Sequence, residues 1–119
     1  VAVGSQLTTA LEATEILAQK GVSAEVIYIH TVKPFDDDIV VQSLLKTKRC
    51  VVLEEHSMYG GVFEDVFRCS RNIDGVKYEA VNAGNRFIHE YGTYEELCRS
   101  VGLCKENVLW KVDELLKTK

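Results

Sequence analysis

The fold class of this chain is decided by one stretch, Val51-Val52-Leu53-Glu54-Glu55-His56-Ser57-Met58-Tyr59-Gly60-Gly61. An unbroken apolar run ends in two carboxylates and an imidazole, and a double glycine then opens a helical pattern. Strands of a parallel sheet are apolar on both sides because helices cover both faces. Such a strand delivers the polar residues that follow it to the carboxyl edge of the sheet, where open α/β folds meet their ligands. The stretch therefore predicts a central parallel strand that ends at a functional edge.

Strand-like and helix-like patterns alternate along the rest of the chain. Helical apolar patterns follow each of four expected strands, which lie at residues 1–3, 25–30, 49–55 and 76–81. This order, with short connections, predicts a parallel sheet between two layers of helices. We therefore expect an α/β fold with three α/β/α layers and a mainly parallel sheet of about four strands. The alternating pattern at 76–81 suits an edge of that sheet, and the unbroken run at 51–53 suits its centre.

The helical patterns also predict which side chains are buried. The first helix is expected to begin with Ser5 as its N-cap and to end at Lys20-Gly21. Asp36-Asp37-Asp38 places negative charge at the start of the second helix, where the macrodipole favours it. The residues expected to be buried are, helix by helix, Leu7, Ala10, Leu11, Thr14, Leu17 and Ala18; Ile39, Val40, Ser43 and Leu44; Val62, Val66, Phe67 and Ser70; Tyr94, Leu97, Cys98 and Val101; and Val108, Leu109, Val112, Leu115 and Leu116.

Composition limits the classes of protein to consider. The chain has 119 residues, is 46% hydrophobic and 27% charged, and has a formal net charge of −4, as expected of one globular domain over residues 1–119. No basic stripe exists to neutralise phosphates, so nucleic-acid binding is not expected. No apolar run reaches the roughly 20 residues that cross a bilayer, so no membrane partner is expected. Four cysteines without C-x-x-C spacing favour a reducing, cytoplasmic location over a zinc site or a disulfide framework.

Glu54, Glu55 and His56 are the first candidate site. They are the residue types of an acid/base cluster, yet neighbours alternate sides along a strand, so at most two of the three point the same way. Gly60-Gly61 permits unusual backbone angles and the close approach of another chain, although a tight turn explains one glycine more simply than two. We expect Glu54, His56, Gly60 and Gly61 to make inter-domain contacts rather than to catalyse a reaction.

Two further candidates lie outside this stretch. Ser5 follows Gly4 at a strand-to-helix turn, where it either caps the helix or helps backbone N–H groups to hold an anion; the absence of a G-x-G-x-x-G or Walker pattern favours the cap. Arg86 lies on the longest loop and is a candidate for an ion pair or a phosphate contact, with an ordinary surface arginine as the simpler alternative. No nucleophile elbow, H-E-x-x-H motif or paired-carboxylate spacing accompanies them. We therefore assign no catalytic, cofactor-binding or metal-binding residue.

Motifs in three parts of the chain match one family, in the same order. The segments are Lys33-Pro34-Phe35-Asp36; Leu53-Glu54-Glu55-His56 with Gly60-Gly61; and Ala83-Gly84-Asn85-Arg86-Phe87-Ile88 with Gly92, Glu95-Glu96-Leu97 and Gly102-Leu103. They resemble the K-P-L-D, V-E-E-H…G-G and G-x-D-x-F…G…E-L-L…G-L patterns of the C-terminal domain of transketolase-like thiamine-diphosphate enzymes. Within that family, 1-deoxyxylulose-5-phosphate synthases and split transketolase C-terminal subunits look nearest, and the pyruvate dehydrogenase β-subunit is more distant.

The chain departs from the family pattern at several points. The short antiparallel strand that usually precedes the position of Val1 is missing, and Val1 itself already reads as strand, so we expect a piece of a longer protein. Phe63 stands where the family usually has a third glycine, and Asn85 stands where it usually has aspartate. The loop at His89-Glu90-Tyr91 is one residue longer than in the synthases. These departures leave the exact family member open.

The resemblance implies a role in a larger enzyme. In this family the C-terminal domain supplies no ligands to thiamine diphosphate or its Mg²⁺, which the preceding pyrimidine- and diphosphate-binding domains hold at a dimer interface. The C-terminal domain packs against the pyrimidine-binding domain and contributes to dimerisation. By resemblance, this chain is an inactive fragment or subunit of a homodimeric enzyme that transfers a two-carbon unit from a ketose phosphate or 2-oxo acid.

Two other readings of the residues stay open. The first is a free-standing, flavodoxin-like binding or regulatory module without enzymatic activity. A receiver-type regulator is disfavoured within that class, because no acidic pair ends the first strand to bind Mg²⁺. The second is a small anion-binding enzyme that uses Ser5 and His56.

Overall fold

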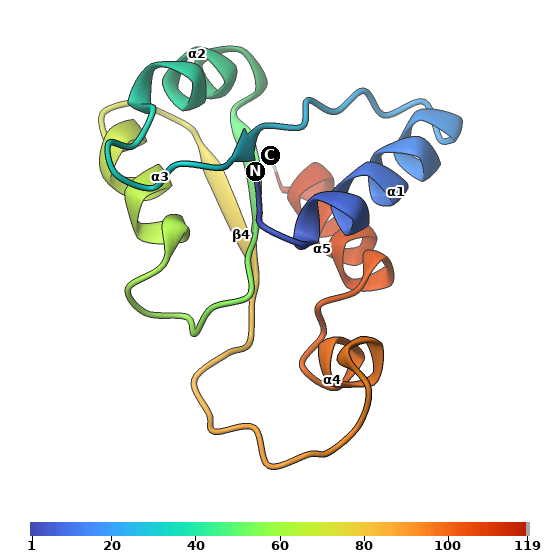
Figure 1. Ribbon diagram of the computed structural model, residues 1–119. Helices are drawn as coiled ribbons and strands as arrows, with labels where there is room; N and C mark the ends of the chain where they lie inside the picture. The colour runs from blue at the N-terminus through green and yellow to red at the C-terminus, as the bar shows by residue number, and fades with distance from the viewer. Residues whose placement is uncertain (119) are drawn as a thin grey trace.

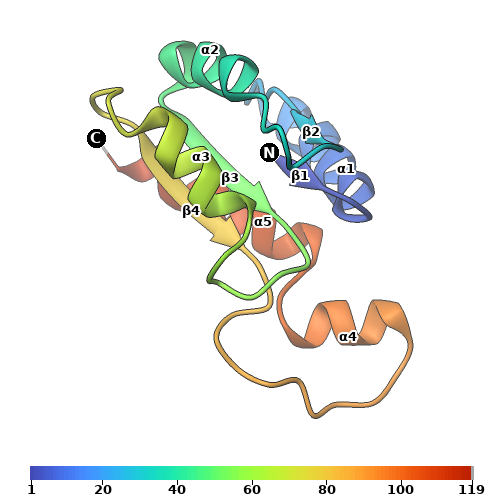
Figure 2. The ribbon, with the colours of Figure 1, turned by 60° about the vertical axis from the view of Figure 1, so that its left-hand side comes forward.

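The computed structural model describes residues 1–118 and shows a parallel sheet between two layers of helices (Figures 1 and 2). The four strands pair in the order β2-β1-β3-β4, all parallel. Helices α1 and α5 cover one face, and α2 and α3 cover the other. The predicted three-layer α/β/α fold is confirmed. The elements are β1 (Ala2–Val3), α1 (Gln6–Gln19), β2 (Tyr28–Ile29), α2 (Asp37–Thr47), β3 (Arg49–Leu53), α3 (Val62–Ser70), β4 (Lys77–Val81), α4 (Tyr94–Ser100) and α5 (Lys105–Lys117).

The strand that contains the apolar run lies inside the sheet, as predicted. β3 pairs with β4 over its full length, from Arg49 opposite Lys77 to Leu53 opposite Val81, and pairs with β1 on its other side. The alternating strand β4 is an edge, also as predicted. β2 is shorter than the expected 25–30, because its only partner strand, β1, is two residues long.

Each face of the sheet carries its own core. Val52 of β3 and Val66 of α3 are fully enclosed on the α2/α3 side. Leu53, the next residue of β3, points to the opposite face and packs with Ala13 of α1 and Val108 of α5. This alternation explains why the central strand is apolar without interruption.

The buried face of α1 differs from the predicted one. Gln6, Ala13 and Leu17 are its buried residues, whereas Leu11 keeps 48% of its surface exposed and Ala18 is exposed. The prediction followed apolar content, but the rotation of the helix is set by packing against both the sheet and α5. That packing draws a polar residue, Gln6, into the interior.

The other predicted faces are partly confirmed. Val40 and Leu44 of α2 are buried, but Ile39 is 46% exposed. On α3, Val66 is buried but Phe67 is half exposed and lies edge-on to another ring rather than in the core. Helix α4 has no buried residue, contrary to prediction, because it lies beyond the end of the sheet (Figure 2). Within residues 1–118, no helix is both long and apolar enough to span a bilayer.

The predicted helix ends are mostly confirmed. Lys20 is the C-cap of α1, and Gly21 follows it in the left-handed region at φ 78°. Asp36 caps α2 by accepting a hydrogen bond from the N–H of Ile39 at 3.3 Å, and Asp37 and Asp38 occupy its first turn. Negative charge therefore lies at the positive end of the helix dipole, as expected.

Candidate functional site

The carboxyl ends of β1, β3 and β4 meet at one end of the molecule, the lower end in Figure 1. The long connections 54–61 and 82–93 leave the sheet there. Consecutive carboxylates at the end of β3 point to different neighbours, as the alternation of a strand predicts. Glu54 turns toward α3 and Glu55 turns toward α1 and α4.

Glu54 is buried, with 3% of its surface exposed, and it holds the start of α3. Its Oε2 accepts the N–H of Val62 at 2.8 Å, and its Oε1 accepts the N–H of Phe63 at 3.0 Å. These are N–H groups of the first helical turn, which have no partner within the helix. The carboxylate also meets the positive end of the helix dipole. Glu54 is therefore a helix cap supplied from a strand.

The double glycine has two separate structural causes. Gly60 has a φ of 75°, in the left-handed region that favours glycine. Gly61 has an ordinary φ of −98°, but a Cβ atom there would lie only 2.5 Å from Oε2 of Glu54. Gly61 therefore leaves room for the capping carboxylate. Glu64 completes the turn by accepting the N–H of Gly60 at 2.8 Å.

Phe63, two residues after the double glycine, packs toward the interior. Its ring is half-buried against the α2/α3 core and lies edge-on to Tyr78, with the ring centroids 6.5 Å apart. Its backbone N–H still reaches Glu54. The bulky ring is therefore accommodated without loss of the cap.

Glu55 is the centre of a second polar cluster, between α1 and α4. It accepts hydrogen bonds from the Tyr94 hydroxyl, from Gln6 Nε2 at 3.4 Å, and from Cys98 Sγ at 3.7 Å. Burial acts to raise the pKa of Glu55, but the hydrogen bonds from its neighbours outweigh it and lower that pKa. The bond to Glu55 raises the pKa of Tyr94 to about 12.

Ser5 occupies the N-cap position of α1 but does not cap it, which corrects the prediction. Its backbone has helical angles, and its side chain accepts no hydrogen bond from the helix N–H groups. Instead its Oγ lies 2.8 Å from the Tyr94 hydroxyl oxygen, so the side chain belongs to the Glu55 cluster.

Sequence reasoning missed two members of that cluster, Gln6 and Tyr94. Gln6 is 2% exposed, and its Oε1 has no hydrogen-bond partner within residues 1–118. Tyr94 was expected in a helix core but is 57% exposed, with only its hydroxyl group engaged. The only signal for Gln6 was its place immediately after the turn that follows β1.

His56 and Arg86 lie apart from both clusters. The ring of His56 is exposed, and its Nδ1 lies 3.0 Å from the carbonyl oxygen of its neighbour Ser57. Arg86, a candidate for an ion pair or a phosphate contact, forms an ion pair with Glu90 at 3.0 Å and also donates to the carbonyl oxygen of Ser100 at 3.4 Å. Among residues 1–118, Ser5 and His56 share no hydrogen bond.

The ionisable side chains Glu54 and Glu55 at the carboxyl end of β3 are both held by hydrogen bonds. The part of the chain that the structure describes contains no group of three His, Cys, Asp or Glu side chains placed to hold a metal ion. The four cysteines are free. Burial raises the pKa of Cys50 and of Cys69, which keeps both thiols protonated.

Comparison with known families identifies the fold more closely. The sequence matches the family described as "Transketolase, C-terminal domain" over residues 1–108. The chain belongs to the transketolase C-terminal domain family. The resemblance seen in the motifs is thus confirmed. In this transketolase C-terminal domain the segment Leu53-Glu54-Glu55-His56 with Gly60-Gly61 lies at the carboxyl end of β3.

Individual relatives are similar over nearly all of the domain. The 6-deoxy-6-sulfo-D-fructose transketolase subunit SqwH of Clostridium sp. (strain MSTE9) is 33% identical over 119 residues, which cover 100% of this chain and 37% of that protein. The putative transketolase C-terminal section of Methanocaldococcus jannaschii is 30% identical, with 98% of this chain and 36% of that protein covered. A 1-deoxy-D-xylulose-5-phosphate synthase of Geobacter sulfurreducens is 28% identical, with 100% and 19% covered.

A solved structure shares the fold. The chain of a structure titled "Split gene transketolase, inactive beta4 tetramer" superposes with a TM-score of 0.85 at 29% identity, over 99% of this chain and 37% of that one. This transketolase C-terminal domain therefore spans little more than a third of the length of its transketolase relatives.

Proposed function

We propose that this domain is the non-catalytic C-terminal part of a thiamine-diphosphate-dependent transketolase-type enzyme that transfers a ketol or two-carbon unit. Its role is to pack against the pyrimidine- and diphosphate-binding domains, or an N-terminal subunit, and to support a homodimer in the cytoplasm. Support comes from the relatives, whose names are those of transketolase subunits, a transketolase C-terminal section and 1-deoxy-D-xylulose-5-phosphate synthases. The split-gene transketolase fold supports the same role.

One observation carries the non-catalytic assignment. Glu54, the buried carboxylate at the edge, already accepts two backbone N–H groups of α3. A general base must come within hydrogen-bond reach of the substrate proton, and this carboxylate is buried with both oxygens directed at the start of α3. The ring of His56, two positions further along, is exposed, and its Nδ1 lies 3.0 Å from the carbonyl oxygen of Ser57. These contacts support a structural role for Glu54, in line with the expectation that this edge makes inter-domain contacts.

The side chains of the edge do not fit thiamine diphosphate and Mg²⁺. A magnesium diphosphate needs free oxygen ligands and positive charge or open N–H groups around the phosphates. Residues 54–65 contain no lysine or arginine, Arg86 of the second connection is paired with Glu90, and the exposed carboxylate of Glu55 would repel a diphosphate. The cofactor is therefore assigned to the other domains of the parent enzyme.

Reconstitution tests this function. Isothermal titration calorimetry of the chain alone with thiamine diphosphate and Mg²⁺ is expected to show no binding, and a ketol-transfer assay is expected to show no turnover. Addition of the cofactor-binding domains of a transketolase relative, as a separate polypeptide, is expected to give a complex by sedimentation and ketol transfer. Tight cofactor binding by the chain alone would refute the proposal, and failure to form any complex would favour the free-standing module.

A further inference from the structure

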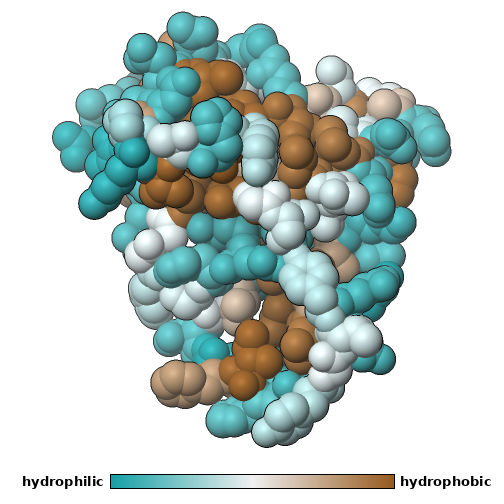
Figure 3. Space-filling view, viewed as in Figure 1, coloured by the Kyte–Doolittle hydropathy of each residue, from teal (hydrophilic) through white to brown (hydrophobic). Residues whose placement is uncertain are grey.

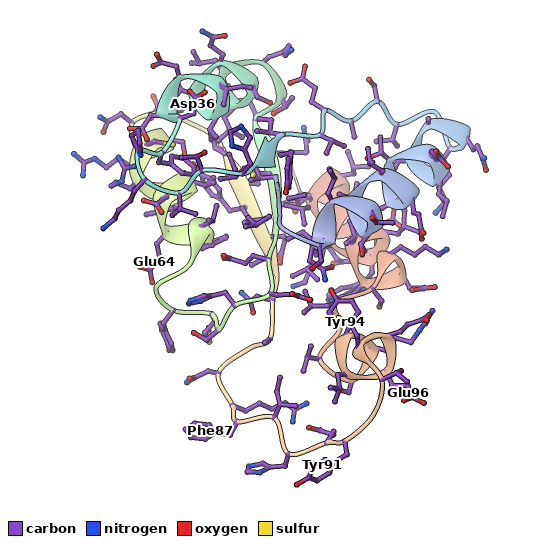
Figure 4. All side chains as sticks on the ribbon, in the orientation of Figure 1. Asp36, Glu64, Phe87, Tyr91, Tyr94 and Glu96 are labelled. Atoms are coloured by element: carbon purple, nitrogen blue, oxygen red, sulfur yellow. The ribbon has the colours of Figure 1, made fainter. Side chains whose placement is uncertain are left out.

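Five large apolar side chains stand exposed on the two loops at the carboxyl end of the sheet, and together they form what we term the loop-tip surface. Its members are Met58, Tyr59, Phe87, Ile88 and Tyr91. Tyr91 is 100% exposed and Phe87 is 85% exposed, more than any other large apolar residue that the structure describes. Both lie at the lower end of the molecule in Figure 4, where Figure 3 shows apolar side chains reaching the surface. A soluble domain rarely presents so much aromatic surface to water without a partner.

The backbones of the two loops that carry this surface are tied together. The two loops are joined by backbone hydrogen bonds from Ala83 N–H to the His56 carbonyl oxygen at 2.9 Å and from Met58 N–H to the Gly84 carbonyl oxygen at 3.0 Å. The ion pair between Arg86 and Glu90 braces the second loop from within. A surface that is already ordered loses little conformational entropy on binding. This arrangement suits a docking site.

The segments that carry these loops are acidic. Residues 54–65 contain no lysine or arginine, and residues 82–100 contain only Arg86 and Arg99. In Figure 4 Glu96 lies toward the same lower end as Tyr91, whereas Glu64 lies higher, on α3. The exposed or half-exposed acids of the two segments are Glu55, Glu64, Asp65, Glu90, Glu95 and Glu96. The partner must therefore accept aromatic side chains at its centre and negative charge at its rim.

We propose that the loop-tip surface docks on an apolar patch with a basic rim, which belongs to the cofactor-binding part of the enzyme and not to a second copy of this domain. A two-fold contact between copies is isologous, so it would place each acidic rim against itself. Like charges that face each other across an interface repel and disfavour that complex. The inference rests on the proposed function, because that function supplies the second polypeptide surface.

Footprinting of the assembled enzyme tests whether the surface is covered. Hydroxyl radicals oxidise exposed methionine and aromatic side chains, so the side chains of the loop-tip surface themselves report whether they are covered. In the complex of this chain with the cofactor-binding domains, Met58, Tyr59, Phe87 and Tyr91 are expected to be protected. Trp110, 55% exposed on α5, is the internal control and is expected to react as an exposed side chain. Oxidation of Tyr91 and Phe87 at the rate of an exposed side chain would overturn the proposal.

Carbodiimide cross-linking identifies the partner. This reagent joins a carboxylate directly to a lysine amine in contact with it. The rim carboxylates are expected to couple to lysines of the cofactor-binding part. Coupling to lysines of a second copy of this domain would show a contact between copies and would overturn the heterologous assignment.

Substitution measures what the surface contributes. Phe87→Ser with Tyr91→Ser is expected to weaken association at least tenfold, because truncated aromatic anchors account for much of an interface's binding energy. Trp110→Ser is the matched control and is expected to leave association unchanged. If the wild-type chain neither binds the cofactor-binding domains nor supports ketol transfer, the proposed function fails. If it does both while the double variant binds as tightly as wild type, the inference alone fails.

Discussion

At the residue scale, Glu54 and Gly61 act as one unit. The carboxylate caps α3 with two hydrogen bonds, and the missing side chain of Gly61 leaves it room. The pair explains why, in this chain, a glycine stands seven positions after the capping carboxylate.

Gly61→Ala is therefore expected to destabilise the domain by about 1–3 kcal/mol, the usual cost of leaving buried polar groups unsatisfied. The new Cβ would lie 2.5 Å and 2.6 Å from the two carboxylate oxygens and force them away from the helix. Urea unfolding checks the value. In a Glu54→Ala background the same glycine substitution is expected to cost little, because nothing remains to be displaced. Additive costs in the double variant would contradict this explanation.

The Tyr94–Glu55 bond predicts a pH dependence at high pH. The pKa of Tyr94 is raised to about 12, against about 10 for a free tyrosine. The hydroxyl proton of Tyr94 is bound more tightly in the folded state than in the unfolded state. This difference stabilises the fold fully below about pH 10, and the stabilisation is lost as the pH rises toward about 12. The difference in unfolding free energy between wild type and Tyr94→Phe is therefore expected to be larger at pH 8 than at pH 11.

Tyr91→Phe is the matched control for that titration, since Tyr91 is fully exposed. It is expected to track wild type at both pH values in urea unfolding. Equal differences for Tyr94→Phe at pH 8 and pH 11 would show that the hydroxyl proton is not held by Glu55.

At the element scale, α1 shows what periodicity predicts and what it does not. The apolar pattern located the helix and both of its ends, because these depend on local signals such as Gly21. The predicted buried face was partly wrong, because Leu11 and Ala18 are exposed although they are as apolar as the buried residues of the helix. Rotation about the axis is set by α5, which comes from the far end of the chain.

Two leucines of α1 test the corrected face. Leu17 is 3% exposed and Leu11 is 48% exposed, although the sequence pattern places both on one face. Leu17→Ala is expected to cost about 2–5 kcal/mol of unfolding free energy, as for other buried leucines. Leu11→Ala is expected to cost about 0.5 kcal/mol or less. Thermal or urea unfolding measures both, and similar losses would restore the original prediction.

At the scale of the whole molecule, the sequence predicted the sheet better than the site. The apolar run of β3 and the alternation of β4 are local patterns, and each strand lies where its pattern placed it. The Glu55 cluster instead joins residues from three distant parts of the chain, Gln6, Glu55 and Tyr94. No local sequence pattern indicates that these three residues are in contact. The motif at the end of β3 marked the correct edge, but its chemistry depended on partners that only the fold brings there.

The acidity of the whole chain, with its net charge of −4, predicts how it meets a partner with a basic rim. Attraction between opposite charges speeds encounter, and salt screens it over about 8 Å at 0.15 M and about 3 Å at 1 M. Association of this domain with separate cofactor-binding domains is therefore expected to slow by about tenfold or more between 0.05 M and 0.5 M NaCl, measured by stopped-flow fluorescence. A rate independent of salt would contradict a basic rim.

Two charge reversals locate the source of that steering. Glu95→Lys on α4 and Glu15→Lys on α1 change the net charge equally, and both side chains are exposed. Only Glu95 lies on the acidic segment beside the loop-tip surface, so only Glu95→Lys is expected to slow association at low salt and to flatten its salt dependence. Equal effects of the two substitutions would mean that net charge alone steers the encounter. A larger effect of Glu15→Lys would place the docking face on α1 instead, because steering is strongest for charges nearest the contact.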